Sequence, residues 1–194
     1  VTLGSESLLL APAMLRLGRA QVSLPPGTFV QASPIAEAEV VELICEGVGK
    51  SKRVADLFSG LGTFSFALAE RAAVDAYESS AEALAALSEA ARHATRLKPV
   101  RIHRRDLLRD PLGWQELKDF DAVVFDPPRA GAAAQAAQLA KSSVRHLVAV
   151  SCNPATLARD LRFLVDGGYK ISRVVPIDQF LYSSHIEVVA HLAR

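Results

Sequence analysis

The amino-acid sequence predicts an α/β fold, with a doubly wound, mostly parallel sheet of seven strands and an antiparallel pair at its C-terminal end. From residue 53 onward, short apolar segments alternate with alanine-rich segments of helical period, which is the pattern of strands joined by helical crossovers. The last two apolar segments have no helical segment between them, so we expect them to pair as antiparallel strands. With 194 residues, half of them hydrophobic, the chain can bury one sizeable core.

The first 32 residues differ from the rest of the chain. Prolines and glycines interrupt their short apolar runs, which is more typical of strands and turns than of a long helix. We therefore predict an irregular lead-in over residues 1–32 and a catalytic domain over residues 33–194. That domain opens with a helix that Ser33 caps and Pro34 begins, and Gly47 and Gly49 end it. Its expected buried side chains are Ile35, Val40, Val41, Leu43 and Ile44.

The remaining elements follow at short intervals along the chain. The apolar patterns predict parallel strands over residues 53–58, 73–78, 100–105, 122–126 and 145–150. Helices are expected over residues 64–71, 81–94, 132–141 and 154–165. The closing antiparallel strands are expected over residues 171–177 and 185–191.

Ligands of open α/β sheets bind beyond the carboxyl ends of the strands, and a glycine-rich loop follows the first parallel strand here. Gly60 and Gly62 would let the backbone approach a ligand, although tight packing explains such a pair about as often. The third glycine of the dinucleotide fingerprint is missing, which disfavours NAD. Glu78 follows the second strand and is suited to accept hydrogen bonds from two ribose hydroxyls. Asp106 follows the third and could bind an adenine amino group or cap the next turn.

Three further side chains at that edge are suited to chemistry. Asp126 closes the fourth strand, and the two prolines after it hold the carboxylate in a rigid turn. Cys152 follows the fifth strand just before a helix N-terminus, which can lower the pKa of a thiol. Glu187 lies on the last strand, where a carboxylate is costly to bury unless it is used or paired. Cys45, inside a helix, is more simply a small buried hydrophobe.

These motifs resemble the bacterial RNA uracil-5-methyltransferases, which modify transfer or ribosomal RNA. The glycine loop and the two acids that follow it also resemble the cofactor site of class I S-adenosylmethionine methyltransferases. The resemblance covers about the last 165 residues and is most specific where Asp-Pro-Pro-Arg and Ser-Cys-Asn-Pro-x-Thr occur in one chain. The segments that carry it are residues 29–31, 56–64, 126–131, 151–160 and 180–187.

By that resemblance, Cys152 is the nucleophile that adds to carbon 6 of uracil, Glu187 is the base that removes the carbon-5 proton, and Asp126 contacts the uracil edge. The chemistry agrees, because carbon 5 of uracil becomes nucleophilic enough to accept a methyl group once a thiolate has added to carbon 6. S-adenosylmethionine is the implied cofactor and RNA the implied partner. The cofactor site would be lined by Gln31, Phe58, Gly60, Gly62, Thr63, Glu78, Asp106 and Asp126.

Two other functions remain open on the sequence. An exocyclic-amine methyltransferase also places a Pro-Pro turn after its fourth strand, but it normally follows the turn with an aromatic residue, where this chain has Arg129, and it has no need of Cys152. A non-catalytic RNA- or cofactor-binding module of the same fold is the other. If the chain is catalytic, Cys152 and Glu187 should face one cavity that also meets the Gly60–Gly62 loop.

Composition adds limits on the setting. The two cysteines lie more than a hundred residues apart, so we expect no disulfide and no metal site, and a reducing cytoplasm fits best. No apolar run approaches the roughly 18 residues of a membrane span. The chain lacks an initiating methionine, so we expect part of a longer protein, whose relatives often carry an RNA-binding barrel or an iron–sulfur site in front. We expect a monomer, and whether the target is ribosomal or transfer RNA stays open.

Overall fold

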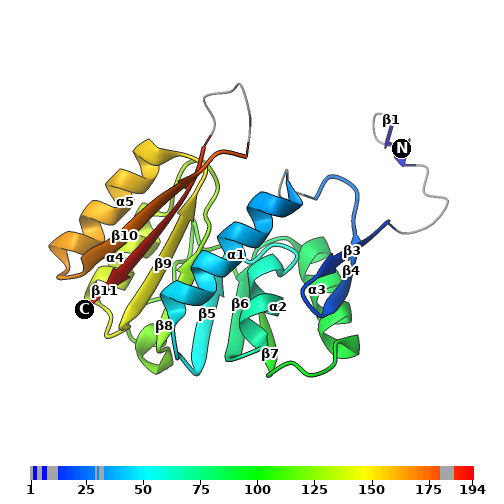
Figure 1. Ribbon diagram of the computed structural model, residues 1–194, viewed down its shortest axis with the longest axis horizontal. Helices are drawn as coiled ribbons and strands as arrows, with labels where there is room; N and C mark the ends of the chain where they lie inside the picture. The colour runs from blue at the N-terminus through cyan, green and yellow to red at the C-terminus, as the bar shows by residue number, and fades with distance from the viewer. Residues whose placement is uncertain (1, 4–5, 8–12, 29, 31–32, 180–185) are drawn as a thin grey trace.

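The computed structural model describes residues 2–3, 6–7, 13–28, 30, 33–179 and 186–194. Its centre is a seven-stranded sheet with strand order β10-β11-β9-β8-β5-β6-β7, in which β11 runs antiparallel to both of its neighbours (Figure 1). This confirms the predicted fold class, including the antiparallel pair at the end. The strands are β5 (Arg53–Leu57), β6 (Ala73–Glu78), β7 (Val100–Arg104), β8 (Ala122–Phe125), β9 (His146–Ser151), β10 (Lys170–Ile177) and β11 (Glu187–Ala193).

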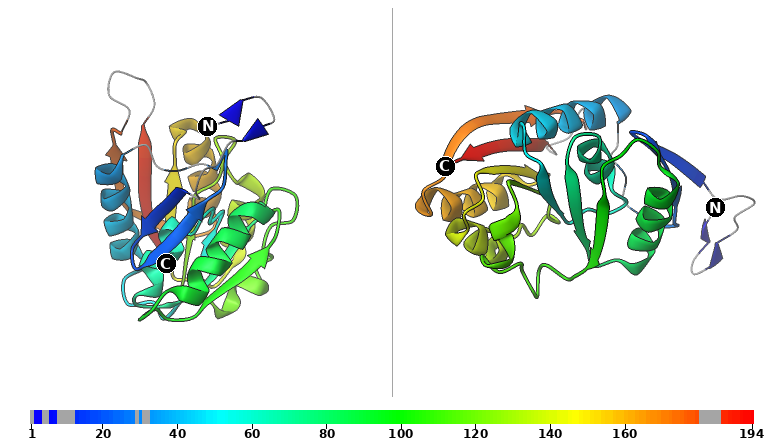
Figure 2. Two further views of the ribbon diagram at one scale, coloured as in Figure 1. Left: turned by 90° about the vertical axis from the view of Figure 1, so that its right-hand side faces the viewer. Right: turned by 90° about the horizontal axis from the view of Figure 1, so that it is seen from below.

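Helices cover both faces of the sheet, as the alternation of buried residues along the strands requires (Figure 2). In β5, Val54 packs with the helices α1 and α2, whereas the next residue, Ala55, packs with α4 and α5 on the opposite face. The helices are α1 (Pro34–Val48), α2 (Thr63–Ala69), α3 (Ala81–His93), α4 (Ala133–Lys141) and α5 (Pro154–Asp166), with a short 3-10 helix, η1, at Glu116–Asp119.

Helix α1 begins as the sequence predicts. Ser33 accepts a hydrogen bond from the Ala36 amide at 3.5 Å, and proline follows it. The prediction that Ile35 is buried is wrong, since 82% of this residue is exposed. Ile35 lies on the outer face of the helix together with Glu39, Glu42 and Glu46. This face points away from the sheet, which the apolar stripe of the helix contacts. The buried stripe consists of Ala36, Val40, Leu43, Ile44 and Val48, and Val41 is partly buried beside it.

The prediction of an irregular lead-in is wrong for residues 13–24. These form an antiparallel hairpin of β3 (Ala13–Leu17) and β4 (Ala20–Leu24), preceded by the short strands β1 (Thr2–Leu3) and β2 (Glu6–Ser7). The two-residue connection begins with Gly18 at φ 55°, and glycine followed by any residue is a favoured hairpin turn. The buried side chains Leu17, Ala20 and Val22 pack with α3 in one apolar cluster. The boundary at residue 33 stays a prediction.

The arrangement of the strands decides where a ligand can bind. Strand order reverses between β5 and β8, which are neighbours at the centre of the sheet. The strands after β5 in the chain, β6 and β7, lie on one side of this point, and those after β8 lie on the other. A crevice opens at the carboxyl ends of strands at such a switch point. Within the described ranges, no helix is both long and apolar enough to cross a membrane.

Candidate active site

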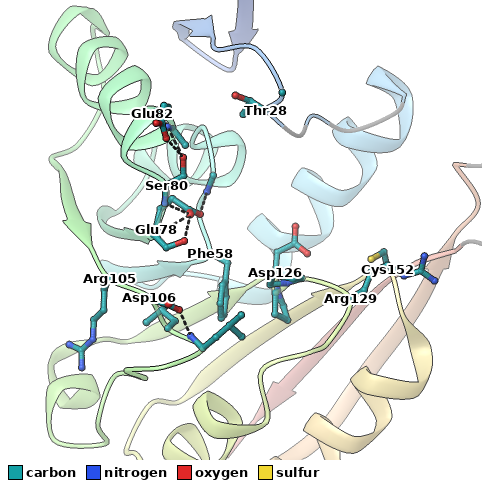
Figure 3. Close-up of a pocket in the computed structure, with 18 of the residues that line it drawn as sticks. Thr28, Phe58, Glu78, Ser80, Glu82, Arg105, Asp106, Asp126, Arg129 and Cys152 are labelled. Atoms are coloured by element: carbon teal, nitrogen blue, oxygen red, sulfur yellow. Dashed lines mark hydrogen bonds between the residues drawn. The ribbon is translucent and has the colours of Figure 1, made fainter. Parts of the chain in front are cut away.

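A cavity of about 970 Å³ lies at the carboxyl edge of the sheet, where the strand order reverses. Small-molecule sites occupy roughly 300–1,000 Å³, so this cavity has room for a cofactor and a base together. It is lined by both Cys152 and Glu187 and meets the glycine loop at Gly60, as the sequence predicts for a catalytic chain. Figure 3 shows Cys152, Asp126 and Arg129 at the same end of this lining. Of the predicted site residues, the cavity is lined by Phe58, Gly60, Glu78, Asp106, Asp126, Cys152 and Glu187.

The two glycines of the loop have different tasks. Gly60 has a φ of 53°, and a Cβ atom added there would meet nothing within 4 Å, so the space beside it is open to a ligand. Gly62 has a φ of 91°, and a Cβ atom there would lie 2.9 Å from Leu87 of α3. Gly62 and Thr63 therefore lie behind the lining, where they begin α2 and pack it. Phe58 is strained at φ 64°, which directs the chain into the loop.

Glu78 ties the glycine loop to the turn that follows β6. Its Oε2 atom accepts a hydrogen bond from the Gly60 amide at 3.0 Å. Its Oε1 atom accepts from the Ser79 amide at 2.7 Å, the Ser79 hydroxyl at 3.0 Å and the Ser80 amide at 2.9 Å. Oε2 has a lone pair left for a ligand hydroxyl, whereas Oε1 is saturated. Glu78 therefore has a fixed orientation before any ligand binds.

Asp106 caps the next turn, which is one of the two roles that the sequence left open for it, and its contact with an adenine amino group stays a prediction. Its Oδ1 atom caps the next turn by accepting from the Leu108 amide at 3.2 Å. The same side chain lines the cavity, opposite the chemical end of the site. Gln31, the other predicted cofactor contact, lies outside the described residues. No group of three metal-binding side chains occurs within the part of the chain that the structure describes.

Asp56, the first residue of segment 56–64, has a buried carboxyl group to which the sequence analysis assigned no role. Its Oδ2 atom accepts a hydrogen bond from the Ser65 hydroxyl at 2.5 Å, and its Oδ1 atom is buried without a partner among the described residues. Burial raises the pKa of Asp56 to about 7, and the neighbouring charge of Glu78 adds to that rise. The signal was present in the sequence, because an aspartate inside an otherwise apolar strand is costly without a use.

Asp126 and Glu187 share the chemical end of the cavity. Burial, followed by repulsion from Glu187 and then from Asp56, raises the pKa of Asp126 to about 8. Burial raises the pKa of Glu187 to about 7, although its Oε2 atom accepts a hydrogen bond from Gln179 at 3.2 Å. Both carboxyl groups therefore exchange protons near neutral pH.

The net pKa of the Cys152 thiol is raised, although the sequence predicts that its place before a helix can lower it. The residue does precede α5, whose N-cap Asn153 accepts from the Ala155 amide at 3.1 Å. Burial nevertheless raises the pKa of the Cys152 thiol, and the carboxyl groups of Glu187 and Asp126 raise it further. The charge of Arg129 acts in the opposite direction. Two nearby carboxylates and partial desolvation thus outweigh the helix terminus.

Sequence reasoning also missed a set of polar contacts between α5 and the turn after Asp126, which we call the α5 clamp. Asn153 and Thr156 both donate to the Arg129 carbonyl oxygen at 3.1 Å. Arg159 donates to the Ala130 carbonyl oxygen at 2.9 Å, and Asp160 accepts from the Ala132 amide at 2.6 Å. Polar side chains spaced three to four residues apart on one helix face were the available signal. The clamp consists of Asn153, Thr156, Arg159 and Asp160.

Comparison with known proteins gives relatives along nearly the whole chain. An RNA methyltransferase of Brucella melitensis, described as uncharacterised, is 55% identical over 181 residues, which cover 93% of this chain and 44% of the relative. The 23S rRNA (uracil(1939)-C(5))-methyltransferase RlmD of Aeromonas salmonicida is 34% identical over 172 residues, which cover 87% of this chain and 39% of the relative. The chain thus spans less than half the length of these relatives.

A solved structure agrees with the sequence relatives. The Pyrococcus abyssi tRNA (uracil-54, C5)-methyltransferase, crystallised with S-adenosyl-L-homocysteine, superposes with a TM-score of 0.81 at 29% identity over 94% of this chain and 44% of that one. Residues 19–194 match the sequence profile of the tRNA (uracil-5-)-methyltransferase family. The match includes the glycine loop, the Pro-Pro turn, Cys152 and Glu187, and the chain therefore belongs to the tRNA (uracil-5-)-methyltransferase family.

Proposed function

We propose that this chain is the catalytic part of an enzyme that transfers a methyl group from S-adenosylmethionine to carbon 5 of a uridine in RNA. The observation that carries the proposal is the shared cavity, because a thiol and a carboxyl group of near-neutral pKa line it together with the glycine loop. An amine methyltransferase needs no such thiol. The names of two of the proteins compared above give ribosomal RNA and transfer RNA as the substrates, and the proposal extends to a uridine in either.

The residues at the cofactor end fit an adenosine and a charged amino acid. Gly60 leaves open space beside the loop, Glu78 offers one lone pair of Oε2 to a ribose hydroxyl, and Asp106 lies further along the lining. Asp56 has a buried oxygen for which the described part of the chain supplies no partner, and such a group calls for a donor. When bound, S-adenosylmethionine supplies an electrophilic methyl group on a positively charged sulfur.

Cys152 makes the covalent bond. Its thiolate adds to carbon 6 of uracil, so that a sulfur–carbon bond forms, the carbon 5–carbon 6 double bond is lost, and the electron pair moves toward carbon 5 and the carbon-4 oxygen. Asp126 has a pKa of about 8 and is therefore mostly protonated at neutral pH. It can donate a hydrogen bond to the uracil oxygen on which negative charge develops. Carbon 5 is then nucleophilic enough to take the methyl group.

Glu187 completes the reaction as a base. It removes the proton from carbon 5, the carbon 5–carbon 6 double bond re-forms, and the sulfur–carbon bond breaks to return the Cys152 thiolate. A base works best when its pKa lies near the working pH, and a pKa of about 7 places Glu187 in that range. Gln179 orients the carboxylate through its hydrogen bond to Oε2.

Covalent trapping tests this function. RNA that carries 5-fluorouridine at the target should crosslink to the full-length protein in the presence of S-adenosylmethionine, because fluorine cannot leave as a cation where Glu187 would remove a proton. Denaturing electrophoresis should show the crosslink as a slow band that is absent from Cys152→Ala. Glu187→Gln should methylate unmodified RNA once and then stall as the same adduct.

The variants also identify the outcome that would overturn the proposal. Near wild-type methylation by Cys152→Ala would exclude the covalent mechanism, and an amine would then become the better target. The natural control is Cys45→Ala, which removes the other cysteine, in α1 and outside the cavity lining. This variant should crosslink as wild type does.

A further inference from the structure

We propose that Arg129 is a positioning residue for the nucleophile: the α5 clamp holds its backbone next to Cys152, so that the guanidinium favours the thiolate against the neighbouring carboxylates. The proposal rests on the proposed function for the role of Cys152. It adds an electrostatic partner to that thiol and a helix that fixes the partner in place.

The clamp fixes the turn that carries Arg129. Two donors, Asn153 Nδ2 and Thr156 Oγ1, converge on the Arg129 carbonyl oxygen at 3.1 Å each. Gly131, at φ 75°, lies so close to α5 that an added Cβ atom would be 2.5 Å from Arg159 Nη2 and 2.6 Å from Asp160 Oδ2. The turn and the first half of α5 are therefore packed into one rigid unit.

Cys152 belongs to that same unit. It immediately precedes Asn153, whose side chain caps α5 through Oδ1 and holds Arg129 through Nδ2. The Asn153 side chain thus connects the start of α5 with the backbone of Arg129, directly next to Cys152 in the chain. Arg129 and Cys152 lie beside one another on the wall of the cavity (Figure 3).

The charges around the thiol show why a cation is needed there. The groups that act on Cys152 are the carboxyls of Glu187, on β11, and Asp126, at the end of β8, both of which disfavour the thiolate, and Arg129, which favours it. Arg105, the other described cation of the lining, is occupied by Asp110 and Glu116. Among the described residues, the Arg129 guanidinium has no ion pair or hydrogen bond of its own, so its charge is free to act on the thiolate.

The rate of thiol alkylation tests this proposal without RNA or cofactor. The full-length protein is treated with iodoacetamide between pH 6 and pH 10, and the modified Cys152 peptide is quantified by mass spectrometry, with Cys45 as an internal reference. Arg129→Gln should move the midpoint of the Cys152 profile upward by about one unit, so that alkylation below the midpoint slows by about tenfold, the usual effect of one adjacent charge. The plateau at high pH and the Cys45 profile should not change.

Two variants separate charge from structure. Arg129→Lys keeps a cation and should restore most of the wild-type midpoint, whereas Thr156→Val removes one clamp contact, keeps the arginine and should give an intermediate midpoint. Arg109→Gln removes the same net charge from a side chain that is 89% exposed and bridged to Asp106, and should leave the profile unchanged.

The opposite results would overturn the proposal. An unchanged midpoint in Arg129→Gln, or an equal shift in Arg109→Gln, would show that no specific interaction exists between Arg129 and the thiol. Failure of Arg129→Lys to restore the midpoint would likewise remove the electrostatic explanation. Each of these results would leave 5-fluorouridine trapping untouched, so the failure of this inference and the failure of the proposed function are distinguishable.

Discussion

Asp126 carries a buried carboxyl group at the candidate site, and its burial lowers stability at alkaline pH. Its pKa is raised in the folded protein to about 8, above its ordinary unfolded value, so the folded state holds the proton more tightly. Its contribution to stability is therefore complete below pH 4 and is lost as the pH rises through about 8. An ionisable side chain at this position therefore weakens the folded state at alkaline pH.

Asp126→Asn should consequently stabilise the protein at alkaline pH. We expect the free energy of unfolding to rise by about 0.5–2 kcal/mol at pH 8.5, because the amide cannot ionise, and the gain to vanish near pH 4.5. Urea denaturation at both values, with the exposed Asp119→Asn as control, measures the difference. A gain of the same size at both pH values would contradict the raised pKa.

The two glycines of the cofactor loop offer a matched comparison at the same scale. Gly62→Ala forces a Cβ atom to within 2.9 Å of Leu87 at φ 91°, so we expect it to cost about 1–3 kcal/mol of stability. Gly60→Ala meets nothing within 4 Å but keeps the left-handed strain at φ 53° and should cost about 1–2 kcal/mol. Calorimetry with S-adenosylmethionine should nevertheless show the larger loss of affinity per folded molecule for Gly60→Ala. Equal losses of affinity in the two variants would contradict the division of tasks between them.

At the scale of the element, the N-terminal hairpin contributes to the core. Leu17 is 1% exposed and packs with α3, so Leu17→Ala should lower the free energy of unfolding by about 2–4 kcal/mol. Met14→Ala, in the same strand but 57% exposed, should change it by less than about 0.5 kcal/mol. Thermal unfolding of the two variants gives the comparison, and equal effects would mean that the hairpin does not pack on α3 in solution.

The hairpin also shows where sequence reasoning stops. Strands such as β5 and β8 are predictable because both faces of a parallel sheet are buried and the apolar runs are continuous. Residues 13–24 alternate instead, and their alternation is obscured by nearby prolines and by the exposed Met14. What covers one face of such a hairpin depends on α3, about sixty residues away, and local pattern carries no information on that contact.

At the scale of the whole molecule, the sequence predicts which residues meet at the candidate site, but it does not predict how their charges act on one another. Glu78 ends a strand, and Asp126 and Cys152 each follow one, and the topology of open α/β sheets brings such positions to one edge. The direction of the Cys152 pKa was not predictable, because it depends on Glu187 from a strand 35 residues later. The α5 clamp was missed because its side chains bind backbone groups of the turn after Asp126, and the spacing of polar residues on α5 does not by itself identify those partners.

The antiparallel course of β11 has a geometric consequence for catalysis. The other strands deliver their last residues to the functional edge, whereas β11 delivers its first, Glu187. Val188 is paired with Ser151 in the ladder, so Glu187 lies across from Cys152, one step beyond the last paired residues. Their separation is thus set by backbone hydrogen bonds between two rigid strands, and no hinge or loop has to close to bring them together. A slip of one residue in the pairing would turn Glu187 to the opposite face of the sheet, so the proposed pairing of Cys152 with Glu187 depends on strand register.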